Sequence, residues 1–191
     1  PVLYADFVTA STHKTMRGPR GGFILCRAEH AERIDAAVWP GTQGSPCMHI
    51  IAAKAVCFRE AMGEPFRVFQ RQVVGNARAL AAALQRGGIH VASGGTDTHI
   101  VALDTVSRGR PGLETLDLLD RCNIIATRYR LIGEAPADGQ FGGLRLGVSS
   151  VTARGFAEPD MEQLAGCLLD IIEGGGKAVD SVRQRVKLLC D

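Results

Sequence analysis

Residues 65–85 constrain the fold most, because apolar side chains recur along this segment at helical spacing without a break. These side chains are Phe66, Phe69, Val73, Ala77, Leu80 and Leu84. The pattern predicts a long helix with one face packed in a core. Gly63 and Pro65 mark a bend where it begins, which predicts a domain boundary. We therefore expect one domain over residues 1–63 and a second over 64–191.

Short apolar runs bounded by turn residues precede the long helix. Runs at 5–9 and 21–26 predict buried strands on either side of a polar loop. Helices are expected over 28–38 and 46–61, and Pro46 suits the first turn of the second one. Strands alternating with helices in this way indicate an α/β fold class.

The remainder of the chain continues the alternation. Strands are expected at "GGIHVAS", "THIVALDT", "NIIAT" and "GLRLGV". Helices are expected at "GLETLDLLDRC", from Glu158 onward, and after the glycines at 174–176. Residues 127–142 show no periodicity, and a loop of that length is usually functional or disordered.

Composition excludes several classes of protein. The formal net charge of +2 on 191 residues gives no electrostatic support for nucleic-acid binding. No apolar run approaches the ~20 residues of a membrane span. The six cysteines are scattered without a C-x-x-C pair, which predicts no metal site and reduced, mostly buried thiols in a cytoplasmic protein. Because the chain opens on Pro1, we expect a processed chain or a fragment.

The loop between the first two strands concentrates polar chemistry. "TASTHKTMRGPRGG" (9–22) places Lys14 among His13, Arg17 and Arg20, with the hydroxyls of Ser11, Thr12 and Thr15 and several glycine amides nearby. Neighbouring cations favour the neutral, nucleophilic form of a lysine amine, and the donors suit a phosphate. Together they suggest pyridoxal phosphate. A solvated basic turn is the alternative, and the residues alone leave both open.

Several segments, in one order along the chain, resemble serine hydroxymethyltransferase. They are "DFVTASTHKTMRGPRGGFIL", "AVWPGTQGSPCMHIIAAKAV", "QRQVVGNARALAAAL", "VASGGTDTHIVALD" and "GLRLGVSSVTARGF". The resemblance implies a pyridoxal-phosphate enzyme of fold type I that interconverts serine and glycine with tetrahydrofolate. It also implies a homodimer (or a dimer of dimers) with active sites at the subunit interface. This chain looks like the second half: the end of the cofactor-binding large domain, then an α+β small domain.

The resemblance assigns cofactor residues by position. Lys14 matches the Schiff-base lysine, and His13 matches a histidine close to the cofactor that affects substrate specificity. Arg20 matches an arginine that supports the loop. Gly44 and Ser45 match a turn that reaches the cofactor phosphate of the neighbouring subunit, where the family usually has two glycines.

One further residue is assigned to the substrate. Arg145, in "GGLRLGV", matches the arginine that holds the amino-acid carboxylate. The role suits a planar guanidinium, which binds a carboxylate through two parallel hydrogen bonds. The alternative is an ordinary exposed charge on a strand.

Two segments depart from the family pattern. Thr127, Arg128 and Tyr129 stand where the family has Asn-Lys-Asn, and residues 139–143 shorten the segment before Arg145. Both regions help to bind folate in the family, so tetrahydrofolate is a doubtful co-substrate here. A folate-independent enzyme of the aldol type, similar to threonine transaldolases or α-methylserine hydroxymethyltransferases, is therefore an alternative.

The family's first half supplies most other cofactor contacts, which have no counterpart in this sequence. We therefore expect the isolated chain of 191 residues to be inactive by itself. A non-catalytic fragment that only binds a partner is the third hypothesis.

Overall fold

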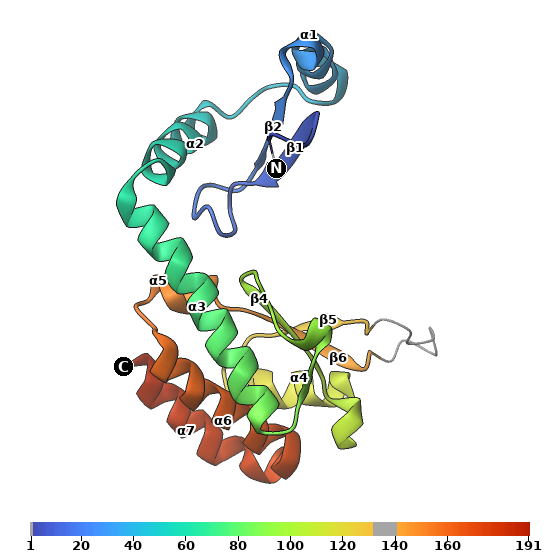
Figure 1. Cartoon of the computed structure of the whole chain (residues 1–191), viewed down its shortest axis with the longest axis vertical. Coiled ribbons are helices and arrows are strands. Elements are labelled where there is room, and N and C mark those ends of the chain that lie inside the picture. Colours follow the sequence, from blue (N-terminus) through green and yellow to red (C-terminus); the bar gives the residue numbers. More distant parts are fainter. Residues whose placement is uncertain (1, 132–140) are drawn as a thin grey trace. The chain divides into compact units, whose positions relative to one another are not determined.

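The computed structural model describes residues 2–131 and 141–191 (Figure 1). The chain divides into two compact units, Pro1–Val68 and Phe69–Asp191, and each is described by itself. Helices and antiparallel sheets make up both units, so the chain is of mixed α/β composition.

The first unit is built on an antiparallel hairpin. Strand β1 (Phe7–Ser11) pairs with β2 (Gly22–Cys26), and the register runs from Phe7 opposite Cys26 to Ser11 opposite Gly22. Helix α1 (Ala28–Ala36), an irregular helical turn (Ala37–Thr42) and helix α2 (Met48–Ala61) follow.

Two expectations for this unit were wrong. The strands are not buried, since among the described residues of the unit only Thr12 and Cys57 are. Helix α2 begins at Met48 rather than in the turn of Pro46, because Ser45 has a left-handed φ of 46° and Cys47 is extended at φ −77°, ψ 100°. Helical hydrogen bonding cannot start before Cys47, which is therefore the N-cap.

The long helix α3 (Glu64–Arg86) confirms the helical pattern and spans the boundary of the two units. The four-stranded antiparallel sheet of the second unit has the order β3-β4-β6-β5. Its strands are β3 (His90–Val91), β4 (Ile100–Asp104), β5 (Thr127–Tyr129) and β6 (Gly143–Gly147). The helices are α4 (Gly112–Arg121), α5 (Ser149–Ala153), α6 (Glu158–Gly174) and α7 (Val179–Cys190). Short 3-10 turns occupy Ala92–Gly94, Val106–Arg108 and Gly175–Ala178.

One face of the sheet packs in the core of the second unit. Side chains alternate along β4 and β6, so that Val101, Leu103, Leu144 and Leu146 are buried, with exposures of 5% or less. They pack with the buried faces of α3 and α6. Helices α6 and α7 run side by side (Figure 1).

The strand expected at "NIIAT" is displaced toward the C-terminus. Asn123 has a left-handed φ of 61°. Its N–H bonds to Asp120 O, and Ile124 N–H bonds to Leu119 O, both at 2.9 Å. These two bonds form a Schellman motif that ends α4. The residues after α4 therefore close the helix and bury Ile124, and pairing begins only at Thr127.

A buried polar network joins α3 to the start of α6. The fully buried Asn76 donates to Thr152 Oγ1 at 2.9 Å and to Phe156 O at 2.8 Å. Gln72 donates to Asn76 Oδ1 at 2.8 Å and to Glu158 at 2.9 Å, and this bond lowers the pKa of Glu158. Each buried group has a partner, so the network stabilises this unit.

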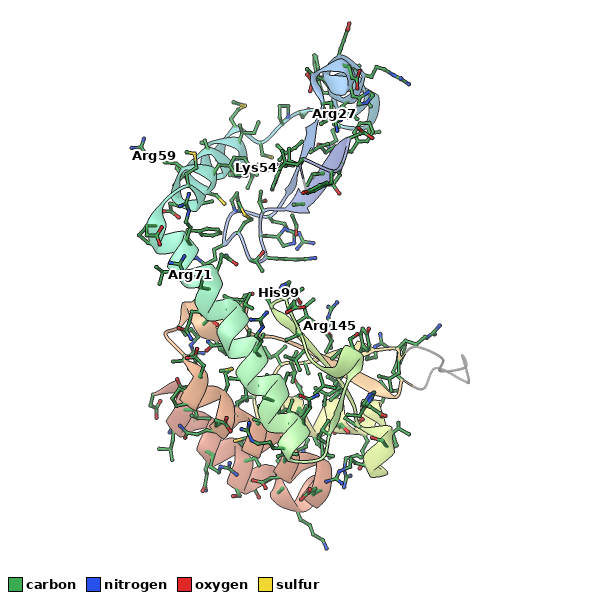
Figure 2. All side chains as sticks on the ribbon, viewed as in Figure 1. Arg27, Lys54, Arg59, Arg71, His99 and Arg145 are labelled. Carbon is green, nitrogen blue, oxygen red and sulfur yellow. The ribbon has the colours of Figure 1, made fainter. Side chains whose placement is uncertain are left out.

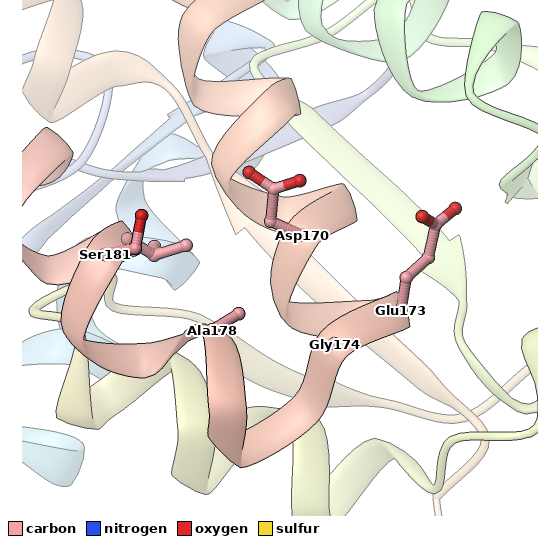
Figure 3. A pocket seen from close by; sticks show the side chains of 6 residues that line it. Asp170, Glu173, Gly174, Ala178 and Ser181 are labelled. Carbon is pink, nitrogen blue, oxygen red and sulfur yellow. The ribbon is translucent and has the colours of Figure 1, made fainter.

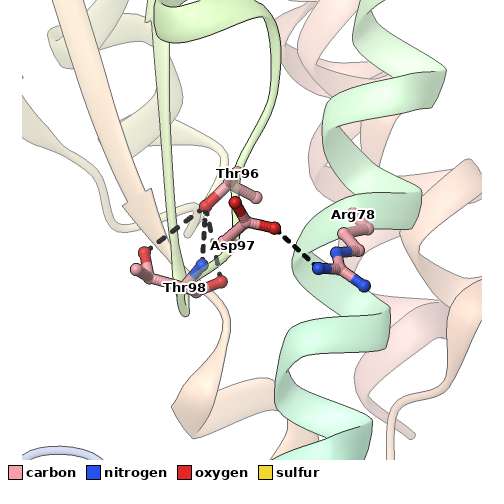
Figure 4. Close-up of polar contacts among 4 residues, drawn as sticks. All are labelled: Arg78, Thr96, Asp97 and Thr98. Carbon is pink, nitrogen blue, oxygen red and sulfur yellow. Dashed lines mark hydrogen bonds and ion pairs between the residues drawn. The ribbon is translucent and has the colours of Figure 1, made fainter.

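The turn before β4 is held to α3. Asp97 forms an ion pair with Arg78 at 2.6 Å, and Thr96 Oγ1 accepts the N–H of Thr98 at 3.1 Å (Figure 4). These contacts fix the entry into β4, the strand that lies next to β6.

All six cysteines lie in the described residues and are free thiols. Cys57, Cys122 and Cys167 are buried, and burial raises the pKa of each thiol. Cys47 and Cys190 are exposed, so the expectation of mostly buried thiols holds for only part of the set. Over 2–131 and 141–191, no helix has the length and apolar character needed to cross a membrane.

Candidate active site

The lysine loop, residues 12–21, joins β1 to β2, and hydrogen bonds between its two ends close it at the base. Thr12 N–H donates to Gly21 O at 3.0 Å, and Gly18 N–H donates to Thr12 O at 2.7 Å. The hydroxyl of Thr12, which is fully buried, donates to Pro19 O at 2.6 Å. This hydroxyl was expected among the phosphate donors, but it is used inside the loop. Thr12 therefore holds the loop in shape.

Lys14 and His13 lie on the outer part of the loop. The carbonyl of Lys14 accepts the N–H of Arg17 at 2.9 Å, and the Lys14 side chain is exposed. His13 Nδ1 lies 3.3 Å from Gly21 N and 3.2 Å from Gly21 O. It accepts from the amide in one tautomer and donates to the carbonyl in the other. In either tautomer, Nδ1 bonds to the backbone of Gly21 at the base of the loop, and this bond orients the imidazole ring.

Helix α2 supports the loop from one side (Figure 2). Lys54 Nζ donates to Gly22 O at 2.9 Å, and the thiol of Cys57 contacts Met16 O at 3.4 Å. A side chain at Gly18 would place its Cβ 2.5 Å from Cys57 Sγ. Sequence reasoning missed both α2 residues. Their i, i+3 spacing puts them on one helical face. This spacing is the feature of the sequence that could have indicated a shared role.

The turn of Gly44 and Ser45 is exposed, and a Cβ added at Gly44 would meet no heavy atom within 4 Å. Ser45 has a left-handed φ of 46°, a conformation that favours glycine. The backbone at Ser45 is therefore one that glycine adopts more readily than serine. The open space over Gly44 leaves room for a ligand to reach the backbone.

We predict that Ser45→Gly stabilises the chain by about 0.5–1 kcal/mol, because it relieves the left-handed strain of a residue with a side chain. Thermal unfolding measures the change. The matched control is Ser150→Gly, at an exposed position of α5, which should destabilise by a similar amount because glycine is a poor helix former. A loss of stability in both variants would contradict the strain at Ser45.

Arg145 lies on β6 of the second unit, on the sheet face opposite the core (Figure 2). Its neighbours across the sheet are Ala102 on β4 and Thr127 on β5. The side chain is exposed, and its Nε donates to Thr127 Oγ1 at 3.1 Å. The guanidinium of Arg145 is therefore anchored on an open face with a small residue beside it.

The predicted residues fall in two places. Lys14, His13 and Arg20 share the lysine loop, and Gly44 and Ser45 lie in a turn of the same unit. Arg145 belongs to the second unit. No group of three or more His, Cys, Asp or Glu side chains that could hold a metal ion occurs in the described parts of the chain.

The two segments that depart from the family pattern are only partly described. Thr127–Tyr129 forms β5, and the guanidinium groups of Arg128 and Arg130 lie 5.0 and 5.7 Å from the ring centre of Phe141. Gly139 and Gln140 lie outside the described residues. The expected loop at 127–142 therefore begins with a strand.

A pocket of about 500 Å³ lies between α6 and α7 (Figure 3). Its carboxylates already have partners, since Asp170 pairs with Arg185 and Glu173 pairs with Arg108. None of the residues predicted for the site lines this pocket.

A family comparison covers the predicted site residues. The family model described as serine hydroxymethyltransferase matches residues 1–168, a range that contains the lysine loop, the turn of Gly44 and Ser45, and Arg145. Because this match extends over most of the 191 residues, the chain belongs to the serine hydroxymethyltransferase family.

Proposed function

We propose that the chain is the C-terminal half of a pyridoxal-phosphate-dependent serine hydroxymethyltransferase of fold type I. The enzyme transfers a one-carbon unit between serine and tetrahydrofolate. In this proposal, residues 1–63 end the large domain and 64–191 form the small domain. The observation that carries it is the exposed amine of Lys14 on a closed loop within the family match.

The residues of the first unit fit pyridoxal phosphate. A lysine amine forms a Schiff base with an aldehyde, and the amine of Lys14 is exposed. Arg20, on the same loop, supplies positive charge for an anionic group. The open backbone at Gly44 suits contact between amides and a phosphate. Lys14 would hold the cofactor covalently, and His13 would lie beside it. When bound, the cofactor supplies the electron sink that weakens the bonds at the amino-acid Cα.

Arg145 would bind and orient the carboxylate of serine or glycine. Its guanidinium is exposed and anchored at Nε, so little rotamer freedom is lost when a carboxylate binds. This orientation fixes which bond at the Cα is placed for cleavage.

Apolar exposure on the first unit supports a larger assembly. Phe7, Ile24, Leu25, Ile51 and Val56 are 41–58% exposed. Exposed apolar side chains gathered in one unit are typical of a surface that another protein surface covers. We propose that a large-domain segment and a second subunit pack against this surface. In that assembly, Gly44 and Ser45 would present their amides to the cofactor phosphate of the neighbouring subunit. The free thiols fit a reducing compartment such as the cytoplasm.

We predict that the isolated chain self-associates, because the first unit leaves its apolar side chains in water. Sedimentation velocity measures this. Replacing Ile24 by Thr together with Leu25 by Lys should weaken the association. Leu188→Lys, at an exposed position of α7, is the control and should not. A well-behaved monomer with a cooperative unfolding transition would contradict the prediction and favour the partner-binding fragment.

The second candidate is a folate-independent enzyme of the aldol type. It is favoured by Thr127, whose hydroxyl is bonded to Arg145 at a position where the family has a folate-binding asparagine. The test is glycine formation from serine with and without tetrahydrofolate, using this chain assembled with the large-domain segment. A large acceleration by folate supports the first proposal, and equal rates support the second. Failure to bind pyridoxal phosphate would remove both.

A further inference from the structure

Two hydrogen bonds join the Thr127 hydroxyl to Arg145 across β5 and β6. Arg145 Nε donates to Thr127 Oγ1 at 3.1 Å, and the same hydroxyl donates to the Arg145 carbonyl at 3.3 Å. One bond uses a lone pair of the oxygen and the other uses its proton, so both can form together. The contact follows from the strand register, which sets Thr127 directly opposite Arg145.

The contact leaves a defined part of the guanidinium available. Nε is used by Thr127, whereas Nη1 and Nη2 have no hydrogen-bond partner within residues 2–131 and 141–191. Ala102 lies opposite on the other neighbouring strand, and a Cβ at Gly147 would meet nothing within 4 Å. At these two positions, therefore, no large side chain lies beside the guanidinium.

We propose that Thr127 is a positioning residue of the substrate site. It holds Arg145 by Nε, so that a carboxylate binds end-on through Nη1 and Nη2 rather than side-on through Nε. The inference rests on the proposed role of Arg145. It gives a function to a residue at which this chain departs from the family pattern, and that function concerns the amino acid rather than folate.

Two substitutions separate the hydroxyl from the shape of the side chain. Thr127→Val keeps the β-branched form that suits a strand but removes the hydroxyl, whereas Thr127→Ser keeps the hydroxyl. Both are made in the assembled enzyme. Calorimetry measures the binding of glycine and of glycinamide, which has no carboxylate charge, and steady-state kinetics gives KM and kcat for serine.

Thr127→Val should weaken glycine binding and raise the KM for serine about fivefold, the factor that corresponds to one ordinary hydrogen bond. Glycinamide binding and kcat should stay within about twofold, and Thr127→Ser should behave like the unsubstituted enzyme. Equal weakening of glycine and glycinamide, an unchanged KM, or a Ser variant as impaired as the Val variant would overturn the inference. If the unsubstituted enzyme bound neither serine nor glycine, the proposed function itself would fail.

Discussion

Replacing Lys14 by glutamine lowers the rate of glycine formation from serine by about 10³-fold or more in the assembled enzyme. The amide nitrogen is not nucleophilic, so it cannot form the covalent bond by which Lys14 would hold the cofactor. Loss of a residue that acts by covalent bonding costs about 10³-fold or more. The measurement is kcat for serine at saturating pyridoxal phosphate.

A matched control separates the chemistry from the loss of positive charge. Lys177 is an exposed lysine on the 3-10 turn after α6, so Lys177→Gln removes the same charge far along the chain from the lysine loop. It should keep kcat within about twofold, since surface changes of this kind have small effects. Comparable activity in the two variants would remove Lys14 from the mechanism.

Replacing Arg145 by alanine raises the KM for serine by about 100-fold, whereas unfolding remains cooperative. Truncating one partner of a charged hydrogen-bonded pair costs about 2–5 kcal/mol, and 2.8 kcal/mol is about 100-fold. The core is preserved because the buried neighbours of Arg145 on β6, Leu144 and Leu146, are unchanged.

Arg145→Lys is the informative companion to the alanine variant. Lysine keeps the positive charge but has neither Nε for Thr127 nor a pair of terminal nitrogens for a carboxylate. We expect a KM between those of the unsubstituted enzyme and Arg145→Ala. Circular dichroism confirms folding in each case. An unchanged KM in the alanine variant would mean that another residue binds the carboxylate.

Local patterns were sufficient for helices α3 and α6 and for the lysine loop. Helices α3 and α6 follow from apolar residues at helical spacing, with Val73, Leu80, Met161 and Leu168 on the buried faces. The hairpin around Lys14 follows from two apolar runs with a polar loop between them. These signals depend only on residues close together in the sequence, which is why periodicity finds them.

The errors arose where the outcome depends on distant residues or on single backbone conformations. The burial of β1 and β2 cannot be predicted from their apolar character, because burial requires a covering surface. The start of α2 depends on the left-handed backbone of Ser45. The contact of Cys57 with Met16 joins residues 41 positions apart, and no local pattern reports it.

The most direct measurement is borohydride reduction of the assembled enzyme in pyridoxal phosphate, followed by peptide mass spectrometry. The lysines of this chain are Lys14, Lys54, Lys177 and Lys187, and peptide mapping distinguishes all of them. Lys54 is the most demanding internal control, because it lies in the same unit and bonds to Gly22 beside the loop. We predict a phosphopyridoxyl group on Lys14 alone. A label on Lys54, or no label on any lysine of the chain, would contradict the assignment of the lysine loop as the cofactor site.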